Sequence, residues 1–166
     1  METVLRITHA GFPQFSARGC QQILELLPIL PIQRTINGDI VPLSSPNLQR
    51  YITTITCQDT LTPALHGLHR GMSVRIACIQ KLVQLVSPAQ NYLELLREPV
   101  PSTVHAFCEH GTLRADVEGR IVRLKSALDT PTYVSYCPEL TMVVLQFSTK
   151  TYEWRPEVEW TLVASE

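Results

Sequence analysis

The residues best suited to chemistry in this sequence are histidines and cysteines, and three of them lie close together. On a strand, Cys108 and His110 would share one face and could reach the same metal ion, whereas His105 would fall on the opposite face. A zinc ion needs two further ligands. The remaining candidates are distant in the sequence: His66, His69 and Cys57. A packed thiol beside two ordinary histidines is the simpler interpretation, so we expect no metal and no cofactor.

The other histidine and cysteine patterns are also ambiguous. His66 and His69 have a spacing that suits a metal on a helix, but Pro63 and Gly67 predict a loop there. Five cysteines without a CxxC motif favour reduced thiols over a disulfide framework. Cys57 and Cys78 fall on two predicted strands that we take as neighbours, where a disulfide is geometrically possible and two free thiols are the expectation.

Catalytic motifs are missing from the sequence. Serine, cysteine, histidine and aspartate all occur, but there is no GxSxG, no HExxH, no phosphate-binding glycine-rich loop and no GxGxxG. We therefore expect a protein that is not an enzyme. The alternative is a small hydrolase or metalloprotein that uses Cys108, His110 and His66.

Two tryptophans near the C-terminal end invite different interpretations. Trp160 alternates with Val158 and Leu162, which predicts a place in the core of a β structure. Trp154 sits in a predicted loop beside Arg155, and tryptophan and arginine are frequent at protein interfaces. We identify Trp154, Arg155 and Tyr152 as a possible interface, and a carbohydrate-binding module using Trp154, Tyr152 and Tyr133 remains an alternative.

Composition excludes several partner classes. The 166 residues carry a net charge of −1 with acidic and basic residues interspersed, so no basic stripe predicts nucleic-acid binding. The N-terminal residues lack the basic start and apolar run of a secretory signal, and no apolar stretch approaches the ~20 residues that span a bilayer. Only 17% of residues are charged, which suggests either a surface covered by a partner or simply a β-rich composition.

The elements that would position these residues are strands. Alternation of apolar and polar residues predicts strands at Tyr51 to Cys57, at Gly71 to Val86 as one strand of about 14 residues, and at the C-terminal pair Thr141 to Thr149 and Val158 to Ala164. Strands as long as the second often bend or pass between two sheets. Shorter strands are expected at the following places: Val4 to Thr8, Val104 to Cys108, Leu113 to Val117, Arg120 to Lys125 and Thr132 to Tyr136.

Turn signals and helical signals complete the pattern. Asn37 and Gly38, between Ile32 to Ile36 and Ile40 to Leu43, predict a hairpin with a two-residue type I′ turn. Cys20 to Leu27 fits a helical face slightly better than a strand, and Tyr92 to Leu96 has helical propensity between prolines.

Together these patterns predict an all-β fold of one domain. We expect an antiparallel β-sandwich or barrel with long strands and minor helix, whose core comes from residues 32–86 and 132–164. Residues 87–131 would form an inserted or peripheral segment.

Two stretches of the sequence resemble small structural proteins of tailed-bacteriophage virions. The C-terminal stretch runs from Tyr136 to Val144 and continues through Glu153-Trp154 to Leu162. The middle stretch includes Asn37-Gly38-Asp39, Tyr51 to Cys57, Pro63-Ala64-Leu65 and Gly71 to Val74. The similarity covers about residues 32–85 and 132–164, and it concerns spacing and aromatic placement.

The resemblance implies a component of the tail tip or baseplate, made in the host cytoplasm and located in the virion tail. It implies a ring of identical subunits that also contacts neighbouring tail proteins, without specific nucleic-acid or membrane contacts. A head–tail connector or tail completion protein, and a carbohydrate- or receptor-binding β module, remain the alternatives. Strand edges that the chain cannot close internally could be completed by a neighbouring subunit.

Overall fold

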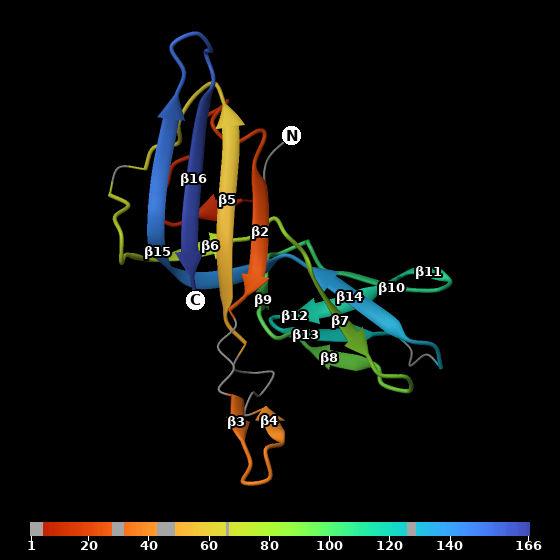
Figure 1. Ribbon diagram of the computed structural model, residues 1–166. Helices are drawn as coiled ribbons and strands as arrows, with labels where there is room; N and C mark the ends of the chain where they lie inside the picture. The colour runs from red at the N-terminus through yellow and green to blue at the C-terminus, as the bar shows by residue number, and fades with distance from the viewer. Residues whose placement is uncertain (1–4, 28–31, 43–48, 66, 126–128) are drawn as a thin grey trace.

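The computed structural model describes residues 5–27, 32–42, 49–65, 67–125 and 129–166. Within these ranges the chain forms antiparallel strands and no helix, which confirms the all-β prediction (Figure 1). No helix long and apolar enough to cross a membrane occurs in the described part. Val4 and His66 lie outside the described residues.

One seven-stranded sheet forms the larger lobe. Its order is β1-β6-β15-β16-β5-β2, and β9 pairs with the start of β15. The strands are β1 (Arg6–Ile7), β6 (Ser73–Ala77), β15 (Pro138–Thr151), β16 (Val158–Ser165), β5 (Tyr51–Asp59), β2 (Gln21–Leu26) and β9 (Glu98–Pro99). The predicted strands β5, β15 and β16 are confirmed, and β1 is a shorter form of the strand expected at Val4 to Thr8.

The bend in β15 curls this sheet around its own core. The first part of β15 pairs with β6 up to Val143, and the second part pairs with β16. The register shifts between Val144 and Gln146, as expected of a β-bulge, which bends a strand locally. As a result β6 and β1 lie behind β15, β16 and β5 in Figure 1. The two layers enclose a core that includes Ile7, Val74, Ile76, Leu140, Met142, Ile55, Trp160 and Leu162.

Two smaller sheets form a second lobe. One has the order β11-β10-β14-β7 and the other β12-β13-β8. Their strands are β11 (Gly111–Leu113), β10 (His105–Cys108), β14 (Thr132–Tyr136), β7 (Leu82–Val86), β12 (Ala115–Glu118), β13 (Ile121–Leu124) and β8 (Tyr92–Glu94). Their core includes Val86, Leu95, Ala106, Val122, Leu124, Val134 and Tyr136. The second lobe thus takes in β7 and β14 together with the described strands of the segment 87–131 other than β9.

The chain passes between the lobes at two places that lie side by side. The prediction of one strand from Gly71 to Val86 is wrong, because β6 ends at Ala77 in the large sheet and β7 begins at Leu82 in the second lobe. The return passage runs from β14 through Cys137 into β15. Cys78 N donates to Pro138 O at 2.9 Å, which joins the two passages. An alternating pattern cannot distinguish one strand from two collinear strands in different sheets.

The predicted hairpin at Asn37-Gly38 is confirmed, but its turn differs. β3 (Ile32–Arg34) pairs with β4 (Ile40–Pro42), and this hairpin projects away from both lobes in Figure 1. Gly38 has φ of 85°, whereas Asn37 is not among the residues with positive φ. Gly38 N donates to Thr35 O at 2.9 Å and Thr35 N to Asp39 O at 2.9 Å. The three-residue loop therefore combines an ordinary turn with a left-handed glycine, instead of the type I′ turn.

Both helical expectations are wrong. The segment Cys20 to Leu27 contains β2, which pairs along its length with β5, and Tyr92 to Leu96 contains β8, which pairs with β13. Pairing with a neighbouring strand overrides a weak local preference. The strand expected at Leu113 to Val117 is divided between β11 and β12. β12 and β13 form a hairpin, with Glu118 opposite Ile121.

Candidate functional site

The predicted interface residues meet at the tip of the β15–β16 hairpin. Trp154 is 74% exposed, and the guanidinium carbon of Arg155 lies 4.5 Å from the centre of its ring. The rings of Tyr152 and Trp154 meet edge to face, with centroids 6.2 Å apart. Arg155 also lies 5.9 Å from the ring of Tyr152. The three side chains therefore form one exposed cluster, which we call the tip cluster.

The hairpin holds the tip cluster on a rigid support. β15 and β16 stay paired out to Thr151 opposite Val158, immediately before the loop. The Tyr152 hydroxyl donates to Glu159 Oε2 at 3.2 Å, and Arg155 N donates to Tyr152 O at 3.4 Å. An aromatic and guanidinium cluster of this kind can stack on a planar group or anchor a partner, because little side-chain entropy remains to be lost.

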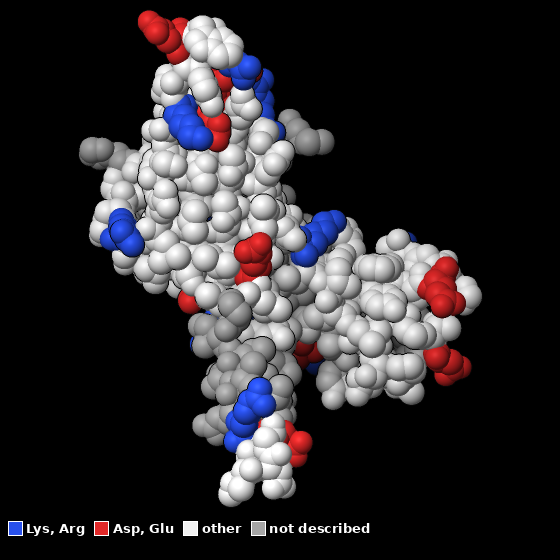
Figure 2. All heavy atoms as spheres, viewed as in Figure 1, with Lys and Arg blue, Asp and Glu red and all other residues white. Residues whose placement is uncertain are grey.

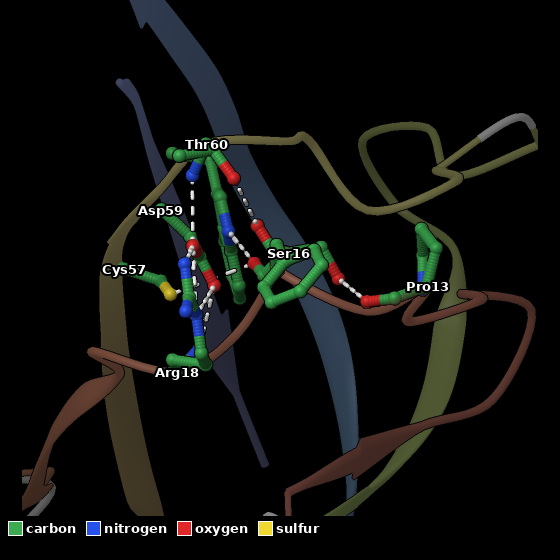
Figure 3. Close-up of polar contacts among 8 residues, drawn as sticks. Pro13, Ser16, Arg18, Cys57, Asp59 and Thr60 are labelled. Atoms are coloured by element: carbon green, nitrogen blue, oxygen red, sulfur yellow. Dashed lines mark hydrogen bonds and ion pairs between the residues drawn. The ribbon is translucent and has the colours of Figure 1, made fainter. Parts of the chain in front are cut away.

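A second polar site joins the N-terminal segment to the large sheet (Figure 3). The buried carboxylate of Asp59 accepts a hydrogen bond from Arg18 N at 2.9 Å and an ion pair from Arg18 Nη2 at 2.8 Å. Thr60 N donates to Asp59 Oδ1 at 2.8 Å. The hydrogen bonds from the Arg18 side chain, with smaller help from the two backbone amides and the charge of Arg18, lower the pKa of Asp59 to about 2.

The same segment caps the central tryptophan of the core. Trp160 Nε1 donates to Ser16 O at 3.0 Å, and the Cys57 thiol donates to the same oxygen at 3.6 Å. Ser16 Oγ donates to Pro13 O at 2.6 Å, which closes a tight loop (Figure 3). Among the described residues, no buried side-chain nitrogen or oxygen lacks a hydrogen-bond partner. We therefore interpret this network as an anchor for residues Pro13 to Arg18, not as a reaction centre.

Sequence reasoning missed the pair of Arg18 and Asp59, although a signal was present. Asp59 continues the inward-facing series Tyr51, Thr53, Ile55 and Cys57 on β5. A carboxylate on a buried face requires a partner. The partner itself, Arg18, could not be identified without the pairing of β2 and β5.

The boundary between the lobes holds another ion pair. Arg97 Nε donates to Glu166 Oε1 at 2.8 Å, and Arg97 Nη2 donates to Glu166 Oε2 at 3.0 Å. Arg97 Nη2 also donates to Gln49 O. The side chains of Arg97 and Glu166 are only 15% and 11% exposed. An open hollow next to this pair is lined by Glu94, Leu95, Leu96, Arg97 and Arg120. Arg120 already pairs with Glu94 at 2.9 Å, so both arginines of the hollow are bound to carboxylates.

The metal-like residues are not brought together. Cys108 ends β10 and lies opposite Gly111, His110 lies in the turn between them, and His105 begins the strand. His69 is in the loop before β6, and Cys57 is in the large sheet. Among the described residues no group of three or more potential ligands gathers around one point.

The expected proximity of Cys57 and Cys78 is wrong. Cys57 lies on β5, whose neighbours are β16 and β2, whereas Cys78 follows β6, whose neighbours are β1 and β15. β5 and β6 are consecutive in this region of the chain but belong to opposite layers of the curled sheet. The thiol that meets Cys57 is Cys20, a residue for which we predicted no role.

The middle of the outer face of the long strands is free of charge, whereas its ends carry Glu25 and the ion pair of Lys150 and Glu159. Two cross-strand rows lie on this face, and each row takes one residue from β2, β5, β16 and β15 in turn. The rows are Gln21, Thr56, Thr161 and Ser148, and Ile23, Thr54, Val163 and Gln146. Neither row contains a charged residue, and the face seen in Figure 2 is largely free of charge except near its ends.

β2 leaves one edge of the large sheet open. It pairs with β5 alone among the strands that the structure describes. Ile23 and Leu26 on this strand are 57% and 53% exposed. Proteins usually protect an edge with charge, proline or a covering loop, and β2 carries one charged residue, Glu25.

No family model, curated protein or solved structure matches this chain.

Proposed function

We propose that this chain is a non-enzymatic assembly protein whose copies join through the open edge of β2 and the neutral outer face beside it. The observation that carries the proposal is the combination of an edge strand with exposed Ile23 and Leu26 and an adjoining face whose two middle rows carry no charge. Main-chain groups on a free edge can pair with a strand of another subunit.

The β2–β5 hydrogen-bond pattern indicates which groups face the partner. Leu27 N donates to Arg50 O at 2.8 Å, so this residue pair is a hydrogen-bonded one. Hydrogen bonding alternates along an antiparallel ladder, so the amides of Gln22, Leu24 and Leu26 point away from β5. These donors would bind the carbonyl groups of an added strand.

The proposal includes the position in a tailed-phage tail tip or baseplate that the sequence resemblance implies. A subunit whose open edge meets a different edge of the next copy makes a head-to-tail contact, and repeated contacts of this type form a ring when the rotation from copy to copy closes. A neutral face suits this arrangement because the interface core of subunits is poor in charged residues.

Light scattering coupled to size-exclusion chromatography tests the assembly. The purified chain should form a discrete oligomer, and Ile23→Lys should weaken this oligomer by at least about tenfold, because it places a desolvated charge at the edge. Ile121→Lys is the matched control, since Ile121 is 39% exposed on β13, a central strand of the second lobe that lies outside the proposed contact. Both variants should melt like the parent.

A chain that stays monomeric at high concentration and is absent from purified phage particles contradicts the proposal. Counting copies against a tail-tube protein in such particles tests the ring directly, and a multiple of three or six is the expected result.

A carbohydrate-binding role is the second candidate, and the 74% exposure of Trp154 favours it. The third residue considered for this role, Tyr133, lies on β14 in the other lobe, so Tyr152 and Trp154 would have to act without it. A glycan array with the parent and Trp154→Ala distinguishes the two roles. Binding that depends on Trp154, with no oligomer, would favour the second.

A further inference from the structure

The register between β2 and β5 brings two cysteines opposite one another. The paired residues run without a break from Leu26 opposite Tyr51 to Gln21 opposite Thr56. One further step in the same register pairs Cys20 with Cys57. The strands stay close beyond this point, because a Cβ on Gly19 would lie 3.0 Å from Gln58 O, and Arg18 N donates to Asp59 Oδ2 at 2.9 Å.

Hydrogen-bonded and non-hydrogen-bonded pairs alternate along an antiparallel ladder, and this alternation shows which kind Cys20 and Cys57 form. Leu27 and Arg50 form a hydrogen-bonded pair, and Cys20 with Cys57 lies seven steps away, an odd number that makes it a non-hydrogen-bonded pair. At such pairs the Cα atoms are about 4.5 Å apart and the side chains approach most closely. A disulfide requires about 4.4–6.8 Å between Cα atoms, and the spacing typical of a non-hydrogen-bonded pair falls within this range.

The two thiols face each other and differ in environment. Both belong to the inward side of the strands, where Cys57 is fully buried and Cys20 is partly exposed. The neighbouring Cys20 side chain and the Gly19 amide lower the pKa of Cys57, whereas the neighbouring Cys57 and burial raise the pKa of Cys20. Cys57 is thus the better thiolate of the two, and Cys20 is the one that a reagent can reach.

We propose that Cys20 and Cys57 are a redox modification site, which closes into a cross-strand disulfide when a small-molecule disulfide such as oxidised glutathione is present. The Cys20 sulfur attacks one sulfur of the reagent while its proton passes to the neighbouring Cys57 sulfur, and the departing half of the reagent takes that proton from Cys57 and leaves as a reduced thiol. The Cys57 thiolate then attacks the Cys20 sulfur and releases the second reduced thiol. The protein loses two hydrogens and two electrons, and the reagent gains them.

The other two buried cysteines, Cys78 and Cys137, lack the features that favour a disulfide between Cys20 and Cys57. Cys78 and Cys137 lie near the two passages between the lobes, and their thiols donate to the carbonyl oxygens of Ile76 at 3.8 Å and Ile79 at 3.7 Å. Burial raises the pKa of Cys78 to about 11 and also raises that of Cys137. Neither thiol meets a cysteine in a strand register, so both should stay reduced.

Closing this disulfide would fasten the capping segment. The bond joins Cys20, which follows Arg18 and Gly19, to the C-terminal part of β5, close to the Ser16 carbonyl that accepts the hydrogen bond from Trp160. It also closes a chain loop from residue 20 to residue 57, which restricts the unfolded chain. This modification is independent of the proposed assembly through the β2 edge.

The experiment uses the full chain and oxidised glutathione in excess. Intact mass should fall by two hydrogens, free thiols should fall from five to three because two of the five cysteines are consumed, and peptide mapping should join the peptides of Cys20 and Cys57. The melting temperature should rise by roughly 10 °C and return to its starting value with dithiothreitol. Cys20→Ser should abolish the shift, whereas Cys108→Ser should keep it.

Each outcome of this experiment decides the proposal. A joined peptide of Cys20 and Cys57 together with the reversible shift supports it, and the Cys20→Ser variant avoids disturbing the fully buried Cys57. Glutathione retained on Cys20 as a stable mixed disulfide, a bond between Cys78 and Cys137, or five unchanged thiols would each overturn it.

Discussion

The two lobes of this protein bury the inner faces of their sheets in different ways. In the larger lobe the bend in β15 folds the sheet over itself, so that one face is enclosed and the other is a neutral, polar surface. In the second lobe two small sheets share a core, and the outer face of β10, β14 and β7 carries apolar residues. These residues are Phe107, Tyr133, Leu85 and Val83, exposed by 37%, 40%, 54% and 56%.

This difference indicates where each lobe gains its stability and where it offers contacts. The large lobe concentrates its burial around Trp160, which contacts Phe12 at 6.1 Å between ring centres. The second lobe leaves a row in which Phe107 stacks on Tyr133 at 5.7 Å, with Leu85 as the next cross-strand neighbour. We therefore expect substitutions in the large core to affect folding, and substitutions on the outer face of the second lobe to affect contacts.

Removal of Trp160 should have the largest effect. Trp160→Ala should lower the free energy of unfolding by about 3–5 kcal/mol, because it leaves a cavity beneath the capping segment and removes the donor to Ser16 O. Urea unfolding followed by circular dichroism measures this loss. Trp154→Ala at the exposed hairpin tip is the control and should change stability by less than about 0.5 kcal/mol. Equal losses in the two variants would contradict the placement of the core.

Removal of the ion pair of Arg97 and Glu166 between the lobes should have the second-largest effect on stability. Arg97→Met leaves the nearly buried carboxylate of Glu166 without its charged partner, and we expect a loss of about 2–4 kcal/mol. Arg75→Met is the control, because the pair of Arg75 and Glu139 is largely exposed and should contribute less than about 1 kcal/mol. Urea unfolding with a probe in each lobe measures both. If the two variants unfold alike, Arg97 does not couple the lobes.

The sequence alone predicted the local elements better than their arrangement. The alternation along Tyr51 to Cys57 identifies β5 and its buried face, because successive side chains of a strand point to opposite faces of the sheet. The division of Gly71 to Val86 into β6 and β7 was not predictable in detail, because both parts alternate and only tertiary pairing separates them.

The same limit applies to the sites. Tyr152, Trp154 and Arg155 are close in sequence, so their meeting at one loop could be predicted. Cys20 and Cys57 are far apart, and their pairing depends on a register that β2 shares with β5. Because Cys20 to Leu27 also fits a helical pattern, nothing local indicates that β2 pairs with β5.

The link of the capping segment to the large sheet should depend on pH. The pKa of Asp59 is about 2 in the folded chain, below its ordinary value of 3.8, so its ionised form stabilises the fold. This stabilisation is complete above the ordinary value and is lost as the pH falls from about 4 toward 2. The difference in melting temperature between the parent and Asp59→Asn should therefore be constant near neutral pH and shrink in this acid range. A difference that is independent of pH would mean that the charge of Asp59 does not matter.

The smallest effect on stability is expected at the outer face of the second lobe. Tyr133→Ser should change the free energy of unfolding by about 0.5 kcal/mol, since its side chain already contacts solvent. The neighbouring Val134 faces inward and is fully buried, so Val134→Thr should cost about 1–3 kcal/mol by placing a hydroxyl in the core. Urea unfolding compares the two. One residue along β14 separates these outcomes, because successive side chains point to opposite faces of the sheet. If Tyr133→Ser proves as costly as Val134→Thr, the outer face is covered in the folded protein, and the contrast between the two lobes disappears.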